Sequence, residues 1–230
     1  MHWFYDPSIT DSSSVITAIE LEHFKSLRIR DGDEIAITNG VGGVLTATVS
    51  NAATGQLEPK SFQVTARPTP EIHLVQSLAK GGRDEAALQA AVELGVSSIT
   101  PLQASRSVVE WGAKAPRNQE RWNQIAISAM KQSQQAFGAA INDLSTLKQL
   151  IPVGTGLVLD PQASTSIVGL QLENEVTIVV GPEGGFAQHE IDSLASQGFV
   201  GVRLGVSILR TSSAGPAAIA ALMALSGQWS

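Results

Sequence analysis

Short apolar runs separated by turn residues dominate the first 70 residues of the chain. β-Branched or alternating residues occupy 34–38, 44–49 and 62–66, and Asp, Asn and Gly residues lie between these runs. Alternation with a period of two is typical of half-buried strands. We therefore expect a small β-barrel over residues 1–70, ending at the Arg-Pro-Thr-Pro stretch 67–70, where two prolines interrupt any strand.

From residue 71 onward the pattern changes to strands that alternate with helices. The expected strands are 71–78, 96–101, 156–160 and 176–180. The expected helices are 83–94, 119–136, 189–197 and roughly 213–225. The runs GLVLD and VTIVV are nearly continuous in apolar residues, which is typical of parallel strands covered on both faces. The order predicts an α/β domain with a mostly parallel sheet over residues 71–230.

Two glycine-punctuated segments near the C-terminus carry the strongest functional signal. Residues 176–186 (VTIVVGPEGGF) and 204–215 (LGVSILRTSSAG) are each typical of a strand that runs into a turn opening a helix. In open α/β sheets, ligands bind at such turns. Three glycines within 181–185 require a sharp turn, a close backbone approach, or both. We expect one shared pocket, the alternative being a structural turn without a ligand.

Several common site types are excluded. The GPEGG sequence does not match the GxGxxG dinucleotide fingerprint, and no GxxxxGK[ST] phosphate loop occurs. The absence of cysteine removes disulfides, thiolate metal sites and sulfur nucleophiles. The four histidines are scattered without ligand spacing, so we expect no metal. No apolar run is long enough to span a membrane and the N-terminus does not resemble a targeting segment, which predicts a cytoplasmic protein.

The charge is unevenly distributed along the chain. The net charge is −6, but residues 103–131 contain five basic and two acidic side chains, a local excess of +3. This region is either a surface that contacts phosphates or an ordinary solvated face. Arg210 follows the second glycine segment and is suited to pairing with a carboxylate or phosphate, the alternative being a salt bridge to Glu183. Thr211, Ser212 or Ser213 is expected to cap the last helix.

Together these motifs closely resemble a known family. GPEGGF and LGxxILRTxxA occur with KGxR at 80–83, ELGVSSITPL at 93–102, SRSV at 105–108, RW at 121–122 and QS at 132–133. In this order and spacing they are similar to the bacterial small-subunit ribosomal RNA uridine-N3 methyltransferases, of the SPOUT (α/β-knot) superfamily. The segment HFKSLRIR at 23–30 and the turn residues after it resemble that family's PUA-like RNA-binding barrel.

The resemblance implies a SPOUT domain over 71–230 with a deep trefoil knot, a PUA-like RNA-binding barrel over 1–70, and a homodimer. It implies that S-adenosylmethionine lies bent in the knot, with its adenine held by main-chain groups of the turns. By position, the residues implied for the cofactor are Leu159, Gly181, Glu183, Gly184, Leu204, Gly205, Ile208, Leu209 and Thr211.

The implied reaction is methylation of N3 of a specific uridine in 16S ribosomal RNA, within an assembled 30S particle. This agrees with the lack of cysteine, because the deprotonated N3 attacks directly and needs no covalent intermediate. The implied catalytic residues are Arg210, which stabilises the imide anion or holds a phosphate, and Glu183, which positions a ligand or Arg210. The residues implied for RNA contact are Lys25, Arg28, Arg30, Lys80, Arg83, Arg106 and Gln132.

The sequence departs from the family pattern at two places. Ser212 and Ser213 replace the Glu-Thr of the usual LRTETA, and Gln135 replaces the arginine of QSxR. The first change removes a carboxylate at a helix start, and the second removes a cation expected near RNA. Two alternatives therefore stay open: a non-catalytic RNA-binding or ribosome-assembly factor of the same fold, and a SPOUT methyltransferase acting on another RNA site.

Overall fold

The structure is a computed structural model that describes residues 1–229. The chain forms two compact units. The first comprises residues 1–67 and 130–138, and the second comprises residues 68–129 and the chain from 139 onward. The chain therefore leaves the first unit after residue 67, returns to it at the end of a long helix, and leaves it again after residue 138. Within residues 1–229, no helix has the length and apolar character needed to cross a membrane.

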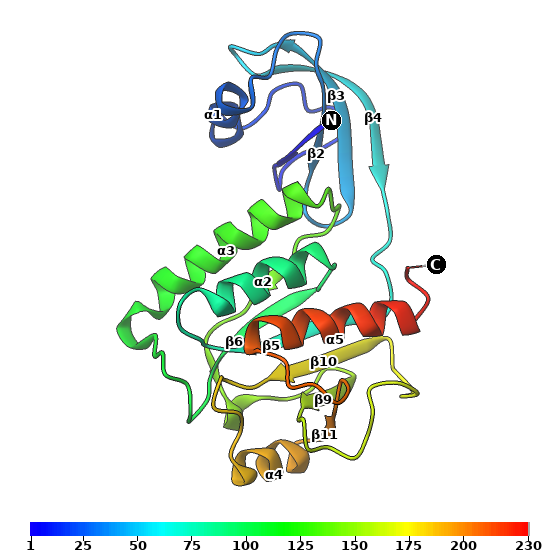
Figure 1. The fold of residues 1–230 in the computed structure, drawn as a ribbon. Helices are drawn as coiled ribbons and strands as arrows, with labels where there is room; N and C mark the ends of the chain where they lie inside the picture. Colours follow the sequence, from blue (N-terminus) through cyan, green and yellow to red (C-terminus); the bar gives the residue numbers. More distant parts are fainter. Residues whose placement is uncertain (230) are drawn as a thin grey trace. The chain divides into compact units, whose positions relative to one another are not determined.

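The first unit is a four-stranded mixed sheet with one helix (Figure 1). Its elements are β1 (His2–Tyr5), α1 (Ala18–Leu27), β2 (Glu34–Thr38), β3 (Gly43–Asn51) and β4 (Gln56–Val64). β1 and β2 are parallel, whereas β2, β3 and β4 are antiparallel. The ring centroids of Phe4 and Phe24 lie 5.0 Å apart in its core. Where a barrel was expected, the strand pairings of the described residues give a sheet with β1 and β4 at its edges.

Residues 130–138 belong to the first unit because of contacts across long stretches of sequence. The carbonyl oxygen of Ala136 accepts hydrogen bonds from Gly42 N at 3.0 Å and Thr38 Oγ1 at 2.9 Å. The Lys131 ammonium lies 2.8 Å from the buried carboxylate of Glu20, which requires a partner of opposite charge. The side-chain hydrogen bonds of Thr38 and Lys131 span 98 and 111 residues of sequence. No local sequence pattern therefore predicts that residues 130–138 belong to the first unit.

The second unit is built on a parallel sheet. Its strands are β5 (Glu71–Ser77), β6 (Ser98–Gln103), β7 (Ala140–Ile141), β8 (Ser145–Thr146), β9 (Thr155–Leu159), β10 (Glu175–Val180) and β11 (Phe199–Val202). The order is β11-β9-β10-β5-β6-β7, β8 also pairs with β6, and each of these pairs is parallel. The mostly parallel sheet predicted for this part of the chain is confirmed.

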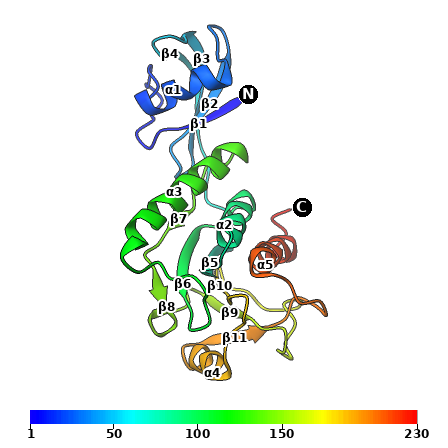
Figure 2. The same cartoon turned by 60° about the vertical axis from the view of Figure 1, so that its left-hand side comes forward.

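Helices cover both faces of this sheet. They are α2 (Arg83–Glu93), α3 (Ala115–Gln132), α4 (Gln188–Ser196) and α5 (Thr211–Leu225), with short 3-10 turns η1 (Gly112–Lys114) and η2 (Leu147–Gln149). α2 and α5 lie side by side on one face, and α4 lies on the other (Figures 1 and 2). In β5, Leu74 packs against Gly215 of α5, whereas Val75 joins a core cluster with Leu194 of α4. The central strands are therefore apolar on both faces.

The pattern-based expectations hold where the periodicity is strong. The strands expected at 34–38, 71–78, 156–160 and 176–180 are present, as are the four expected helices. The strand expected at the start of 204–215 is wrong, because residues 204–210 form no regular element and the strand of this region, β11, ends at Val202. Helix α1 was not predicted, since its buried side chains are only Glu20 and Phe24 and it shows no apolar stripe.

Candidate functional site

The strand order brings the glycine turns to one edge of the second unit. β11, β9 and β10 are neighbours, and they end at Val202, Leu159 and Val180. Because these strands are parallel, the turns after them leave the sheet at the same carboxyl edge. Ligands of open parallel sheets bind outside this edge.

Every residue predicted to hold the cofactor lies in or beside these three turns. They are Leu159 at the end of β9, Gly181, Glu183 and Gly184 after β10, and Leu204, Gly205, Ile208, Leu209 and Thr211 after β11.

The loop at 181–186 is a compact turn in which Gly181 packs against the ring of Phe186. Gly185 N donates a 2.9 Å hydrogen bond to the Pro182 carbonyl, and Gly185 has a φ of +64°, in the left-handed region. A Cβ at Gly181 would lie 3.2 Å from the Phe186 ring. The left-handed φ at position 185 and the close Phe186 ring at position 181 therefore each favour glycine.

Two arginines hold this loop from neighbouring elements. Arg83, the first residue of α2, places Nη1 3.2 Å from Oε1 of Glu183. Arg106 Nη1 donates a 3.2 Å hydrogen bond to the carbonyl of Gly184. Among the ion pairs of residues 1–229, Glu183 is paired with Arg83 and not with Arg210, so the salt bridge considered as an alternative for Arg210 is absent there.

Glu190, which no motif singled out, ties this loop to the one after β6. Its carboxylate accepts hydrogen bonds from Ala187 N at 2.8 Å and Ser105 N at 3.1 Å. Burial by itself raises the pKa of Glu190, but these hydrogen bonds outweigh it and hold the pKa below its ordinary value. The signal that identifies this residue is its N3 position in α4, where a glutamate reaches back to the backbone N–H of the cap residue.

Asp84 is a second buried carboxylate at this edge, in the first turn of α2. It accepts hydrogen bonds from Ala79 N at 3.2 Å and Glu85 N at 2.9 Å. Burial raises the pKa of Asp84, and the hydrogen bonds offset this only in part. Asp84 thus fixes the turn that carries Lys80 and Arg83.

The segment after β11 is held much less firmly. Arg203 forms backbone hydrogen bonds with Thr165 and Ile167, but from Leu204 to Leu209 the described chain shows no backbone hydrogen bond. Val206 and Ile208 are 103% and 81% exposed. Backbone polar groups and apolar side chains without partners fit a flat ligand that combines a hydrophobic face with hydrogen-bonding edges, such as a purine.

Arg210 and Thr211 mark the start of α5. Arg210 is the N-cap residue, and its carbonyl accepts hydrogen bonds from Ser213 N and Ala214 N. Its side chain is exposed and has no ion-pair partner in the part of the chain that the structure describes. The cap expected at Thr211, Ser212 or Ser213 is wrong, because the helix already begins at Thr211. The Thr211 hydroxyl is instead buried and donates to the carbonyl of Gly181 at 2.9 Å.

The side chains predicted to contact RNA are divided between the two units. Lys25, Arg28 and Arg30 are exposed at the end of α1 in the first unit, and Arg28 adopts a left-handed φ of +58°. Gln132 is exposed and also belongs to the first unit. Lys80, Arg83 and Arg106 are exposed in the second unit, at the carboxyl edge of its sheet.

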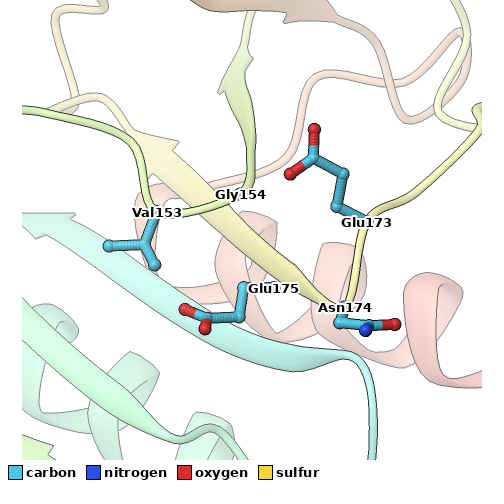
Figure 3. A pocket seen from close by; sticks show the side chains of 5 residues that line it. All are labelled: Val153, Gly154, Glu173, Asn174 and Glu175. Carbon is cyan, nitrogen blue, oxygen red and sulfur yellow. The ribbon is translucent and has the colours of Figure 1, made fainter.

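A depression of about 470 Å³ lies at the opposite, amino edge of the same sheet (Figure 3). It is lined by Val153, Gly154, Glu173, Asn174 and Glu175. Nearby, His73 joins three strands, with Nδ1 2.8 Å from Ser98 Oγ and Nε2 3.2 Å from Glu175. The depression has none of the glycine turns or arginines of the carboxyl edge. Residues 1–229 contain no cluster of three His, Cys, Asp or Glu side chains able to hold a metal.

Known proteins resemble this chain over most of its length. Residues 66–223 match the model of a family described as an RNA methyltransferase domain. A ribosomal RNA small subunit methyltransferase E from Mycobacterium tuberculosis is 32% identical over 98% of this chain and 92% of its own length. The corresponding protein from Bacillus subtilis is 28% identical over 90% of this chain and 88% of its own length.

Two solved structures share the fold over almost the whole chain. A ribosomal RNA small subunit methyltransferase E from Neisseria gonorrhoeae, bound to S-adenosyl methionine, has a TM-score of 0.89 at 30% identity and covers 98% of each chain. A putative methyltransferase from Legionella pneumophila, also in complex with this cofactor, has a TM-score of 0.87 at 27% identity and covers 96% of each chain.

Proposed function

The chain belongs to the ribosomal RNA small subunit methyltransferase E family, and from that premise we propose that it methylates N3 of one uridine in 16S ribosomal RNA, using S-adenosylmethionine. One observation carries this proposal. Three adjacent parallel strands deliver the residues expected for the cofactor to a single edge, where the 204–209 backbone has free hydrogen-bonding groups beside exposed apolar side chains.

The residues at this edge fit the cofactor. Gly205 has a φ of +148°, and a Cβ at this position would meet no atom within 4 Å, so the chain is free to approach a ligand closely there. Leu204 to Leu209 offer main-chain groups for the adenine, with Val206 and Ile208 as apolar cover. When bound, the cofactor supplies a methyl group on a sulfonium, an electrophile that a nitrogen atom attacks directly.

Arg210 is the candidate catalytic residue. Its exposed guanidinium has no carboxylate partner among the described side chains, and it stands at the N-terminus of α5, where the helix dipole favours negative charge. A cation at this place stabilises the imide anion that forms when uridine N3 loses its proton. Glu183 acts indirectly, because its pair with Arg83 holds the 181–186 loop in place.

Recognition of RNA is assigned to the exposed cations of both units. In the first unit, which we propose to be PUA-like, the cations that contact RNA are Lys25, Arg28 and Arg30. At the carboxyl edge of the second unit they are Lys80, Arg83 and Arg106. The net charge of −6 favours a shaped site in an assembled 30S particle over naked RNA. The trefoil knot and the homodimer stay predictions of the family resemblance, and the cytoplasmic location stays a prediction from the sequence pattern.

The decisive experiment is methyl transfer from radiolabelled cofactor to small ribosomal subunits from a strain that lacks the endogenous enzyme. The labelled nucleoside is then identified by chromatography and mass spectrometry. We expect 3-methyluridine at a single position. Label on another atom indicates a related methyltransferase with a different target. No label supports a non-catalytic assembly factor, the alternative suggested by Ser212, Ser213 and Gln135.

A further inference from the structure

A chain of buried hydrogen bonds connects β5, the start of α5 and the loop after β10. Gln76 is fully buried, and its Nε2 donates to Thr211 Oγ1 at 2.9 Å and to the Ser77 carbonyl at 3.1 Å. The Thr211 hydroxyl in turn donates to the Gly181 carbonyl at 2.9 Å. None of these contacts involves the exposed face of the site.

The direction of each bond follows from the groups involved. A carbonyl oxygen only accepts, so the Thr211 hydroxyl proton is used on Gly181 and its oxygen is left as an acceptor. Position 76 must therefore supply an N–H. With both N–H groups of Gln76 engaged, its Oε1 is buried without a partner. An acceptor left in this state destabilises the folded chain, so packing alone does not account for a glutamine here.

The residues joined by these hydrogen bonds lie at the ends of the two loops that form the proposed site. Gly181 begins the 181–186 loop, and Thr211 directly follows the loosely held 203–210 segment. Gln76 lies beside Val180 in the register of β5 and β10. Through its hydrogen bonds, Gln76 therefore connects both loops to the centre of the sheet. Gly215 allows α5 to lie close to β5, because a Cβ at position 215 would lie 3.1 Å from Leu74 Cδ1 and 3.4 Å from Gln76 Oε1.

We propose that Gln76 is a positioning residue for the cofactor, acting through Thr211. The pair holds the end of the 203–210 segment at a set distance from Gly181, so that both loops present their main-chain groups to one ligand. Thr211 thereby contributes to cofactor binding from behind the site, with its hydroxyl turned away from the ligand. This inference rests on the proposed function, since it assumes that the two loops bind S-adenosylmethionine together.

The test uses three variants of the full-length protein. Thr211→Val keeps the shape and removes the hydroxyl, Gln76→Met keeps the length and removes the N–H donor, and Thr211→Ser keeps the hydroxyl. Calorimetry measures the affinity for S-adenosylhomocysteine, and kinetics on small subunits measures KM and kcat. We expect Thr211→Val and Gln76→Met each to weaken binding and raise KM about tenfold, the effect of one or two hydrogen bonds, with kcat changed less. Thr211→Ser should stay within about twofold of the parent.

A matched control separates positioning from general stability. Ser98→Ala removes a side-chain hydrogen bond to His73 in the same sheet, at the opposite edge. We expect it to lower the melting temperature and leave the affinity unchanged. The double variant Gln76→Met/Thr211→Val should bind as weakly as either single variant, because both interrupt one chain of bonds.

The outcomes distinguish this inference from the proposed function. If the parent protein binds no S-adenosylhomocysteine, the cofactor assignment falls and the positioning role with it. If the parent binds and both Thr211→Val and Gln76→Met bind equally well, only the positioning role is overturned. Additive losses in the double variant, or a Thr211→Ser variant as weak as Thr211→Val, also overturn it.

Discussion

The 181–186 loop and the 203–210 segment flank one site but are held very differently. The first is fastened by Arg83, Arg106 and Glu190 and closed by a backbone hydrogen bond of its own. The second has no backbone hydrogen bond from Leu204 to Leu209 within the described chain, and its apolar side chains face outward. One side of the proposed site is therefore formed before a ligand binds, and we expect the other side to gain its partners from the ligand.

This difference gives the two parts of the proposed site different roles in stability and in ligand binding. A preformed loop binds without losing much conformational entropy, whereas an unfastened segment is ordered only when its main-chain groups meet the ligand. We expect substitutions in the first loop to change mainly the stability of the fold. Substitutions in the segment should change mainly ligand binding and turnover.

The largest effect is expected at Arg210. Arg210→Ala should reduce kcat for methyl transfer about 100-fold, because it removes the cation that we propose to stabilise the developing imide anion. Affinity for S-adenosylhomocysteine and thermal stability should stay near those of the parent, since the side chain is exposed. Arg203→Ala, which removes another exposed arginine of the same segment, is the control and should leave kcat within about twofold. Turnover near that of the parent would remove Arg210 from the mechanism.

The next effect concerns the fastened loop and depends on pH. Glu190→Gln should lower the free energy of unfolding by about 2 kcal/mol at pH 7, because an amide nitrogen cannot accept the second backbone N–H. The pKa of Glu190 is lower in the folded state than the unfolded value of about 4.3. Its stabilisation is therefore present above that value and is lost as the pH falls through the folded pKa.

Urea unfolding of the parent and Glu190→Gln from pH 7 to pH 3 tests this sign. The difference between the two proteins should shrink on acidification. A difference that is constant across the range would show that the ionised carboxylate does not contribute. Asp84, whose pKa is raised by burial, has the opposite sign and becomes less costly to the fold as the pH falls.

Two glycines test the comparison directly. Gly185 and Gly205 both have positive φ, +64° and +148°, and a Cβ on either would meet no atom within 4 Å. Alanine at either position thus introduces only backbone strain, of about 1 kcal/mol where the surrounding backbone cannot relax. Gly185→Ala should lower the free energy of unfolding by this amount, because its loop cannot relax. Gly205→Ala should leave stability unchanged and weaken S-adenosylhomocysteine binding, measured by calorimetry; equal effects on stability would contradict the distinction.

The smallest effect is expected for the pair between Arg83 and Glu183. Both side chains are partly exposed, and such pairs contribute less than about 1 kcal/mol. Glu183→Gln should therefore reduce the free energy of unfolding only slightly at low salt, and the difference should vanish near 1 M salt. Unfolding curves at the two salt concentrations measure this. A large, salt-independent loss would show that Glu183 has a buried structural role.

The glycine turns were identifiable from the sequence because glycine is favoured wherever the backbone turns sharply or is approached closely, and that requirement is local. Gly181 is favoured by the nearby Phe186 ring and Gly185 and Gly205 by their positive φ, and the apolar strand before Gly181 is equally local. Glu190 could have been identified from the sequence by its N3 position in a helix, but Gln76 could not. Its role depends on Thr211, 135 residues away, and nothing near residue 76 in the sequence shows that pairing.

By itself the sequence determined the αβ alternation, the apolar strands, the excluded site types and the motifs that resemble the family, since each depends on neighbouring residues. Only the tertiary structure decided the order β11-β9-β10-β5, the return of residues 130–138 to the first unit, and the partners of Glu183 and Thr211. Those features depend on contacts between distant residues, and a hydrogen bond or ion pair leaves no periodic signal in the sequence between its ends.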